Sequence, residues 1–320
     1  MGKPLEKWHE KATKKSLIRK TILMIMIGMA ILVIFVFVGD FASIQNSISR
    51  LSVFSVVLAL FLALMSFFLR FAKWHYLLGV IGVKLPKKES LEIFFIGLSM
   101  SITPGKVGET LKCYLVQQKT GKPFWMTLPV IIVDRVADFV SMILLISFGI
   151  FLFDFGVVPF LLICSVLIVG LLVLKTDFFQ GILKKWTKNF KRAEAIGQLV
   201  DNSKRLTKAV PFSFITILSI IVWTIEGLAM FVLVKQLQLD LSFIHTIFVF
   251  SLGAVAGGIS MIPGGLGVAE GSMTGLLLYF NVGKSDAVSL AVLIRLITLW
   301  FGVLIGLTVY FVKRKKYSEG

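Results

Sequence analysis

Long apolar runs constrain the fold of this chain more than any other feature. Residues 21–39 read TILMIMIGMAILVIFVFVG and contain no charged side chain. A helix needs about 20 apolar residues to cross the roughly 30 Å hydrocarbon layer of a membrane. The whole chain is 57% hydrophobic with a mean hydropathy of +0.91, so we expect an all-α integral membrane protein. Six full spans are predicted: 21–39, 51–69, 126–153, 157–174, 211–234 and 287–312.

The basic residues indicate how these spans are oriented. The chain has 34 Lys and Arg against 17 Asp and Glu, and such an excess gathers in cytoplasmic loops of membrane proteins. With six spans, the basic segments all fall on one side: 1–20, 70–122, 175–208 and 313–320. We therefore expect a multi-pass cell-membrane protein with both termini in the cytoplasm and no nucleic-acid partner. This assignment makes Arg70, Lys73 and Lys112 cytoplasmic loop residues.

Residues 178–200 have the pattern of an amphipathic helix. Phe178, Ile182 and Trp186 recur at helical spacing, and lysines occupy much of the opposite face. Such a helix lies on a membrane surface that contains anionic lipids. We expect it to link two halves of the protein; the alternative is a solvated basic loop.

The same helix-breaking motif occurs twice. Residues 101–108 read SITPGKVG and residues 260–267 read SMIPGGLG, with matching Ser, Pro and Gly positions 159 residues apart. Proline ends an incoming helix, and glycine permits a sharp turn with close backbone approach. An arginine inside apolar sequence follows each motif at nearly equal distance: Arg135 and Arg295. The residues expected to shape the site are Pro104, Gly105, Gly108, Pro263, Gly264, Gly265 and Gly267.

This duplication predicts an inverted repeat. Repeat A covers 51–153 and repeat B covers 211–312. Three full spans separate the two starts, and an odd number of crossings reverses direction. Each repeat is expected to contain one re-entrant hairpin, because a short or interrupted apolar segment before a break favours re-entry. Inverted repeats with broken helices near the bilayer midplane are typical of secondary transporters.

The charged residues within apolar sequence form the candidate site. A helix that begins after the break directs free N–H groups inward and suits a phosphate. Five residues are expected to bind the anionic headgroup of a lipid: Lys106, Arg135, Arg295, Ser101 and Ser260. Five acids are expected to balance charge or carry protons: Glu109, Asp134, Asp138, Glu226 and Glu270. The alternative is a structural network in which the acids neutralise the arginines and Glu109 and Glu270 stabilise helix N-termini.

Three segments resemble a known membrane family. PGKVGE at 104–109, VDRVAD at 133–138 and PGGLGVAEG at 263–271 are similar to the membrane region, or flippase-like domain, of the lysylphosphatidylglycerol synthase family. The resemblance extends from about residue 20 to 312, so 21–312 is expected to be one flippase-like domain. It implies translocation of aminoacyl-phosphatidylglycerol or a polyprenyl-phosphate-linked lipid between leaflets. The soluble synthase domain is expected to be absent, so lysyltransferase activity would need a partner.

Other functions remain possible at this stage. The chain could be a membrane subunit or scaffold of a lipid-modifying synthase or glycosyltransferase, a membrane-embedded lipid transferase, or a carrier of a small soluble anion. The sequence has no nucleophile elbow or His-Asp metal motif, and Cys113 and Cys164 lack metal-ligand spacing. We therefore expect a transporter rather than an enzyme, with no metal or cofactor. The expected partners are a membrane phospholipid or lipid-linked headgroup, an anionic lipid surface and a lipid-modifying enzyme.

Overall fold

A computed structural model describes residues 26, 41–103, 108–153, 161, 165 and 193–318, and the secondary structure of these residues is helical. The first and fourth expected spans therefore lie outside the described residues, apart from Met26, Leu161 and Ser165. The all-α prediction is confirmed. The elements are α2 (Phe41–Ser49), α3 (Val53–Val80), α4 (Lys87–Leu98), α5 (Leu111–Thr120), α6 (Phe124–Leu152), α9 (Ala193–Leu206), α10 (Ala209–Gln236), α11 (Phe243–Ile259), η2 (Pro263–Gly265), α12 (Val268–Tyr279), α13 (Lys284–Arg295), η3 (Leu296–Trp300) and α14 (Phe301–Ser318).

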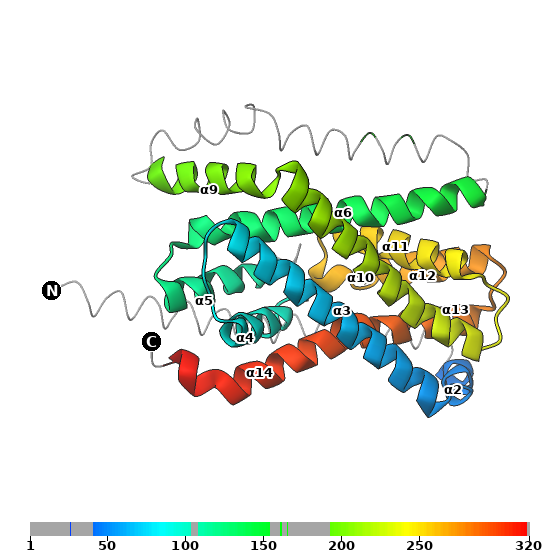
Figure 1. Ribbon diagram of the computed structural model, residues 1–320. Coiled ribbons are helices and arrows are strands. Elements are labelled where there is room, and N and C mark those ends of the chain that lie inside the picture. The colour runs from blue at the N-terminus through cyan, green and yellow to red at the C-terminus, as the bar shows by residue number, and fades with distance from the viewer. Residues whose placement is uncertain are drawn as a thin grey trace.

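Helices α3 and α10 pack side by side and run in opposite directions across the molecule (Figure 1). Each is 28 residues long and strongly apolar. The hydroxyl of Ser52 caps α3 by accepting the N–H of Ser55. These two helices, and the continuous helical stretch Lys284–Lys313, are the described segments long and apolar enough to cross a membrane. Their length and composition indicate an integral membrane protein.

Helix α3 corrects one expectation from the sequence. The span predicted to end at 69 continues to Val80, because apolar residues such as Trp74, Leu77 and Leu78 extend the buried face. Arg70 and Lys73 therefore lie inside the helix rather than in a cytoplasmic loop. Lys112, also expected in a loop, lies in α5 with its side chain 3% exposed.

Two pairs of short helices flank the two breaks. Helices α4 and α5 lie on either side of the first break, and α11 and α12 on either side of the second. Figure 1 shows the α4–α5 pair toward one end of the molecule and the α11–α12 pair toward the other.

Glycine is required at the second break. Pro263 begins the short turn η2, and Gly264, Gly265 and Gly267 have φ of 63°, 65° and 83°, values that side chains disfavour. A Cβ on Gly265 would lie 2.8 Å from the Cα of Gly257 in α11. The predicted close approach is therefore confirmed at this break.

The first break is described only at its edges. Pro104, Gly105 and Lys106 lie outside the described residues. Beyond them, the N–H of Gly108 donates to Thr103 Oγ1 at 2.7 Å, and a Cβ on Gly108 would lie 2.6 Å from the Thr103 side chain. This hydrogen bond and close packing hold Thr103 and Gly108 together at the two edges of the first break.

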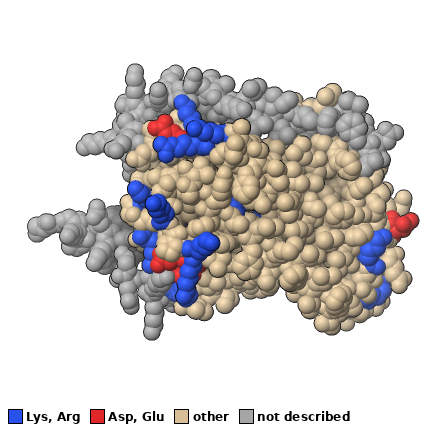
Figure 2. Space-filling model, in the orientation of Figure 1, with Lys and Arg blue, Asp and Glu red and all other residues tan. Residues whose placement is uncertain are grey.

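Charged side chains gather at the two ends of the molecule. Figure 2 shows a broad band between these ends that is almost free of charge. Basic residues are more numerous at the end that carries α5, α9 and the last turns of α14 (Figures 1 and 2). Of the expected amphipathic helix 178–200, residues 178–192 lie outside the described residues. The rest belongs to α9, whose last turn carries Lys204 and Arg205.

Close packing of α14 on α4 leads to a stability prediction. A Cβ on Gly306 would lie 2.5 Å from the Phe95 carbonyl oxygen and 2.5 Å from the Ser99 nitrogen. Gly306→Val should therefore lower the free energy of unfolding in detergent by about 1–3 kcal/mol through overpacking. Gly275→Val in α12, where a Cβ meets nothing within 4 Å, is the control. Equal thermal stability of both variants would contradict this packing.

Candidate functional site

The two breaks meet at one cavity of about 270 Å³ in the interior of the bundle. Ser101 and Thr103 reach it from the first break, and Gly264 and Gly265 from the second. Helices α3, α4, α6, α10, α11 and α12 and the stretch from Arg295 to Gly302 supply further parts of the wall. Backbone without regular hydrogen bonding is tolerated at membrane depth only beside protein or a wet cavity, and this cavity provides such a place.

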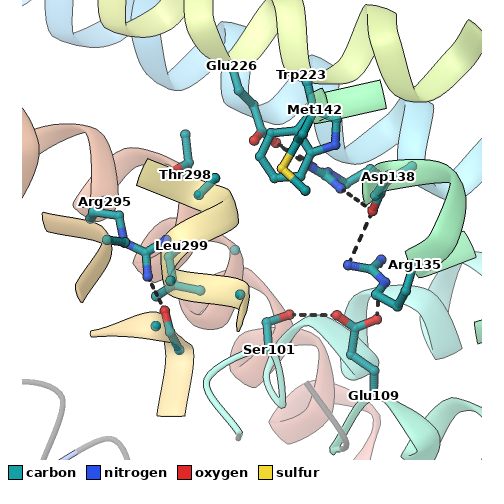
Figure 3. Close-up of a pocket in the computed structure, with 18 of the residues that line it drawn as sticks. Ser101, Glu109, Arg135, Asp138, Met142, Trp223, Glu226, Arg295, Thr298 and Leu299 are labelled. Carbon is teal, nitrogen blue, oxygen red and sulfur yellow. Dashed lines mark hydrogen bonds and ion pairs between the residues drawn. The ribbon is translucent and has the colours of Figure 1, made fainter. Parts of the chain in front are cut away.

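The cavity brings together many residues singled out from the sequence. Arg295 lies on one side of the space, and Arg135 and Asp138 lie on the other (Figure 3). The sequence-predicted residues that line the cavity are Ser101, Glu109, Arg135, Asp138, Glu226, Gly264, Gly265 and Arg295.

Other predicted residues lie outside the lining. Ser260 was expected to bind the headgroup, but its hydroxyl donates to the Gly257 carbonyl at 2.7 Å and does not line the cavity. Asp134 and Glu270 do not line the cavity, and each forms an ion pair with a cation. Lys106, expected to bind phosphate, lies outside the described residues.

Arg135 presents the most accessible positive charge in the cavity wall. Its side chain is 28% exposed, against 11% for Arg70 and 12% for Arg295. Its guanidinium lies 2.7 Å from Asp134 and 3.3 Å from Asp138. The Nε atom has no hydrogen-bond partner among the described residues. That atom is buried, so access to Arg135 comes from the exposed part of its guanidinium, which the acids hold at the cavity wall.

Arg295 braces the second break. Its Nε donates to Glu270 Oε1 at 2.9 Å, and its Nη2 donates to the Gly264 carbonyl. Glu270 also accepts the N–H of Gly267 at 2.7 Å, which satisfies the N-terminus of α12. The helix-capping role expected for Glu270 is confirmed. A π-helical turn, Leu296–Trp300, follows Arg295, and such turns often occur at functional sites.

Both halves use the same pairing. Arg135 lies 3.7 Å from Glu109, just after the first break, and Arg295 pairs with Glu270, just after the second. In each half, this ion pair links the helix that carries the arginine to the segment just after the preceding break. The structural-network alternative is confirmed to this extent: the acids do neutralise the two arginines.

Sequence reasoning missed three cations of this network. Lys73 is fully buried, with its Nζ 2.5 Å from Asp138 and 2.9 Å from Asp134. Arg70 lies 3.0 Å from Glu226 and 3.2 Å from Asp138. Lys112 lies 2.9 Å from Glu109. The available signal was the apolar sequence that continues to residue 80 around Arg70 and Lys73.

The lining is largely apolar and carries charged side chains of both signs. Of the residues that the structure describes, three cations line the cavity, Arg70, Arg135 and Arg295, together with three acids, Glu109, Asp138 and Glu226. Aromatic and aliphatic residues supply much of the remaining wall, including Phe67, Phe94, Trp223 and Phe250. A guanidinium in such surroundings can bind a phosphate through two parallel hydrogen bonds, and the low dielectric strengthens that contact.

Comparison with known proteins places the chain among membrane proteins. A family model described as "Lysylphosphatidylglycerol synthase TM region" matches residues 25–306. A UPF0104 membrane protein of Methanocaldococcus jannaschii is 26% identical over 66% of this chain and 92% of its own length. A UPF0104 membrane protein of Pyrococcus horikoshii is 22% identical over 90% of this chain and 95% of its own. One from Methanothermobacter thermautotrophicus is 22% identical over 88% and 92%.

Proposed function

The chain belongs to the lysylphosphatidylglycerol synthase TM-region family, and on that premise we propose that it carries a phosphate-bearing lipid headgroup between the two leaflets of the membrane. The cargo class is a lipid such as aminoacyl-phosphatidylglycerol or a polyprenyl-phosphate-linked lipid. The headgroup occupies the central cavity while the acyl chains remain in the bilayer. Transport rather than catalysis is the proposed activity.

The proposed membrane arrangement has six full spans and two re-entrant hairpins in an inverted repeat. The α4–α5 pair enters from one side, and the α11–α12 pair enters from the other. The end rich in basic residues faces the cytoplasm of the cell membrane, because Lys and Arg gather there. The almost uncharged band between the two ends (Figure 2) supports this placement.

One observation carries the proposal: Arg135, from the first repeat, and Arg295, from the second, line the same cavity between the two breaks. A carrier must hold its cargo at a place that either side can reach in turn, and inverted repeats place such a site at their interface. Ionised side chains at membrane depth are costly, and lining a polar cavity accounts for their presence.

The proposal is tested by reconstituting the full chain into liposomes. Fluorescent phosphatidylglycerol, aminoacyl-phosphatidylglycerol and a polyprenyl phosphate are each scored for exchange between leaflets by quenching of the outer leaflet. Arg135→Ala and Arg295→Ala should slow exchange severalfold or more, because a charge-assisted phosphate contact is lost. Arg50→Ala is the control, since Arg50 pairs with Asp286 away from the cavity.

The outcome separates transport from the other functions considered. Equal movement in the wild type and both cavity variants, or no movement of any lipid, would overturn the assignment. A scaffold would co-purify with an enzyme and move no lipid alone. A transferase would yield a modified lipid when given a donor. Arg135→Lys and thermal unfolding in detergent show whether a slow variant is still folded.

A further inference from the structure

Ten charged side chains in and behind the cavity wall cancel one another. Among the described residues, the cations are Arg70, Lys73, Lys112, Arg135 and Arg295, and the acids are Glu109, Asp134, Asp138, Glu226 and Glu270. Five of each sign give a net charge of zero when all are ionised. A monoanionic phosphate that enters this set leaves one negative charge unbalanced.

An unbalanced charge among these buried side chains has a high free-energy cost. The side chains of Asp138, Glu226 and Lys73 are 3%, 5% and 0% exposed, so water screens them little. A buried group in this position responds by changing its protonation state rather than by remaining charged. Entry of an anionic headgroup therefore favours the uptake of one proton by one of the acids.

Among the described acids that line the cavity, Glu226 has the fewest cations within 4 Å. Its one ion-pair partner within 4 Å among the described residues is Arg70, which it shares with Asp138. Asp138 has three cations within that distance, and Asp134 and Glu109 each have two. Glu270 has Arg295 and a backbone N–H, and it does not line the cavity.

The surroundings of Glu226 suit a group that gains and loses a proton. It lines the cavity from α10, and the Ser66 hydroxyl of α3 donates to its Oε1 at 2.8 Å. The charged groups that share the cavity with it are Arg70 of α3, Arg135 and Asp138 of α6, Arg295 of α13, and Glu109 before α5, whereas α11 supplies only uncharged residues to the wall. A phosphate held by Arg135 adds negative charge to the same space.

We propose that Glu226 binds one proton when a headgroup with one net negative charge, such as that of phosphatidylglycerol, enters the cavity, so that lipid and proton cross the membrane together without net movement of charge. This inference rests on the proposed function. The proton forms a neutral carboxyl O–H on Glu226 as the phosphate pairs with Arg135, and it leaves when the headgroup leaves. Binding of each ligand strengthens binding of the other, as linkage requires.

Two gradients applied separately test the coupling. Liposomes containing the full chain and a trace of fluorescent phosphatidylglycerol receive either a pH difference or a membrane potential. A pH difference of about one unit should enrich the lipid about tenfold in the leaflet facing the alkaline side. A potential of about 60 mV should leave the distribution unchanged, whereas an anion moving alone would shift about tenfold. Protein-free liposomes measure spontaneous movement.

Glu226→Gln supplies the decisive variant. Glutamine copies the neutral, protonated shape and keeps hydrogen-bonding capacity toward Ser66 and Arg70, but it cannot exchange a proton. The lipid distribution should then follow the membrane potential and ignore the pH difference. Glu92→Gln is the matched control, because Glu92 is also buried and pairs with Lys313 away from the cavity. It should retain the wild-type response.

The outcomes distinguish this inference from the function on which it rests. If no lipid moves, both the carrier function and the coupling are overturned. If phosphatidylglycerol moves but follows the potential in the wild type, the carrier function stands and the coupling is wrong; Lys106 would then be the cation that offsets the phosphate. If Glu226→Gln keeps the pH response, another acid binds the proton and the assignment to Glu226 is wrong.

Discussion

Gly258→Trp is expected to stop lipid exchange while leaving the protein folded. Gly258 lines the cavity near the end of α11, and a Cβ built on it meets nothing within 4 Å. An indole side chain therefore enters open space without clashing with the backbone. Because Gly258 lines the cavity of about 270 Å³, we expect the indole to obstruct entry of a headgroup. Exchange should fall to the rate of protein-free liposomes.

Gly275→Trp is the matched control for this prediction. Gly275 is also an exposed helical glycine with nothing within 4 Å of its Cβ, but it lies in α12 and does not line the cavity. Both substitutions remove a glycine from a helix and add the same side chain, so their effects on helix propensity should be similar. Exchange in Gly258→Trp that matches Gly275→Trp would show that the lipid takes another path.

Lys73→Met is expected to cause the largest loss of stability of any substitution considered. Lys73 is fully buried, and its ammonium group lies between Asp134 and Asp138 and beside the Ser219 hydroxyl. Removing one partner from a buried ion pair leaves uncompensated charge and typically costs about 3–5 kcal/mol. Thermal or chemical unfolding of the purified protein in detergent measures the change.

Lys313→Met gives the comparison that isolates burial. Lys313 also pairs with a carboxylate, Glu92, at 3.4 Å, but its side chain is 36% exposed. Glu92 is buried, but the ammonium group of Lys313 stays partly in water, so we expect the pair to contribute only about 1 kcal/mol. A similar loss of stability in both variants would contradict the assignment of Lys73 to a buried network. It would favour the exposed loop position that local hydropathy predicts for Lys73.

The helices and their breaks could be predicted from the sequence because both are local properties. Apolar runs mark α6, α10 and the stretch from Lys284 onward, and each Pro-Gly motif marks a break. The duplicated motif also pointed to Arg135 and Arg295, since each follows its Pro-Gly pair at nearly the same spacing. These two arginines do line one cavity.

Charge partners could not be predicted in the same way. Local hydropathy ended the second span at residue 69 and treated Arg70 and Lys73 as loop residues. Their acids lie far away in the chain, on α6 and α10. Ser260 shows the opposite error, because it matches Ser101 in sequence yet bonds to its own helix and does not line the cavity.

The sequence by itself determined the membrane class, the two breaks and the pair of arginines, because hydropathy and backbone chemistry act between near neighbours. Only the tertiary structure decided that Arg70 and Lys73 belong in the interior and that Glu226, within the described part of the chain, pairs with one cation that it shares with Asp138. The reason is physical: the cost of a buried charge depends on which opposite charge the fold brings within a few ångströms.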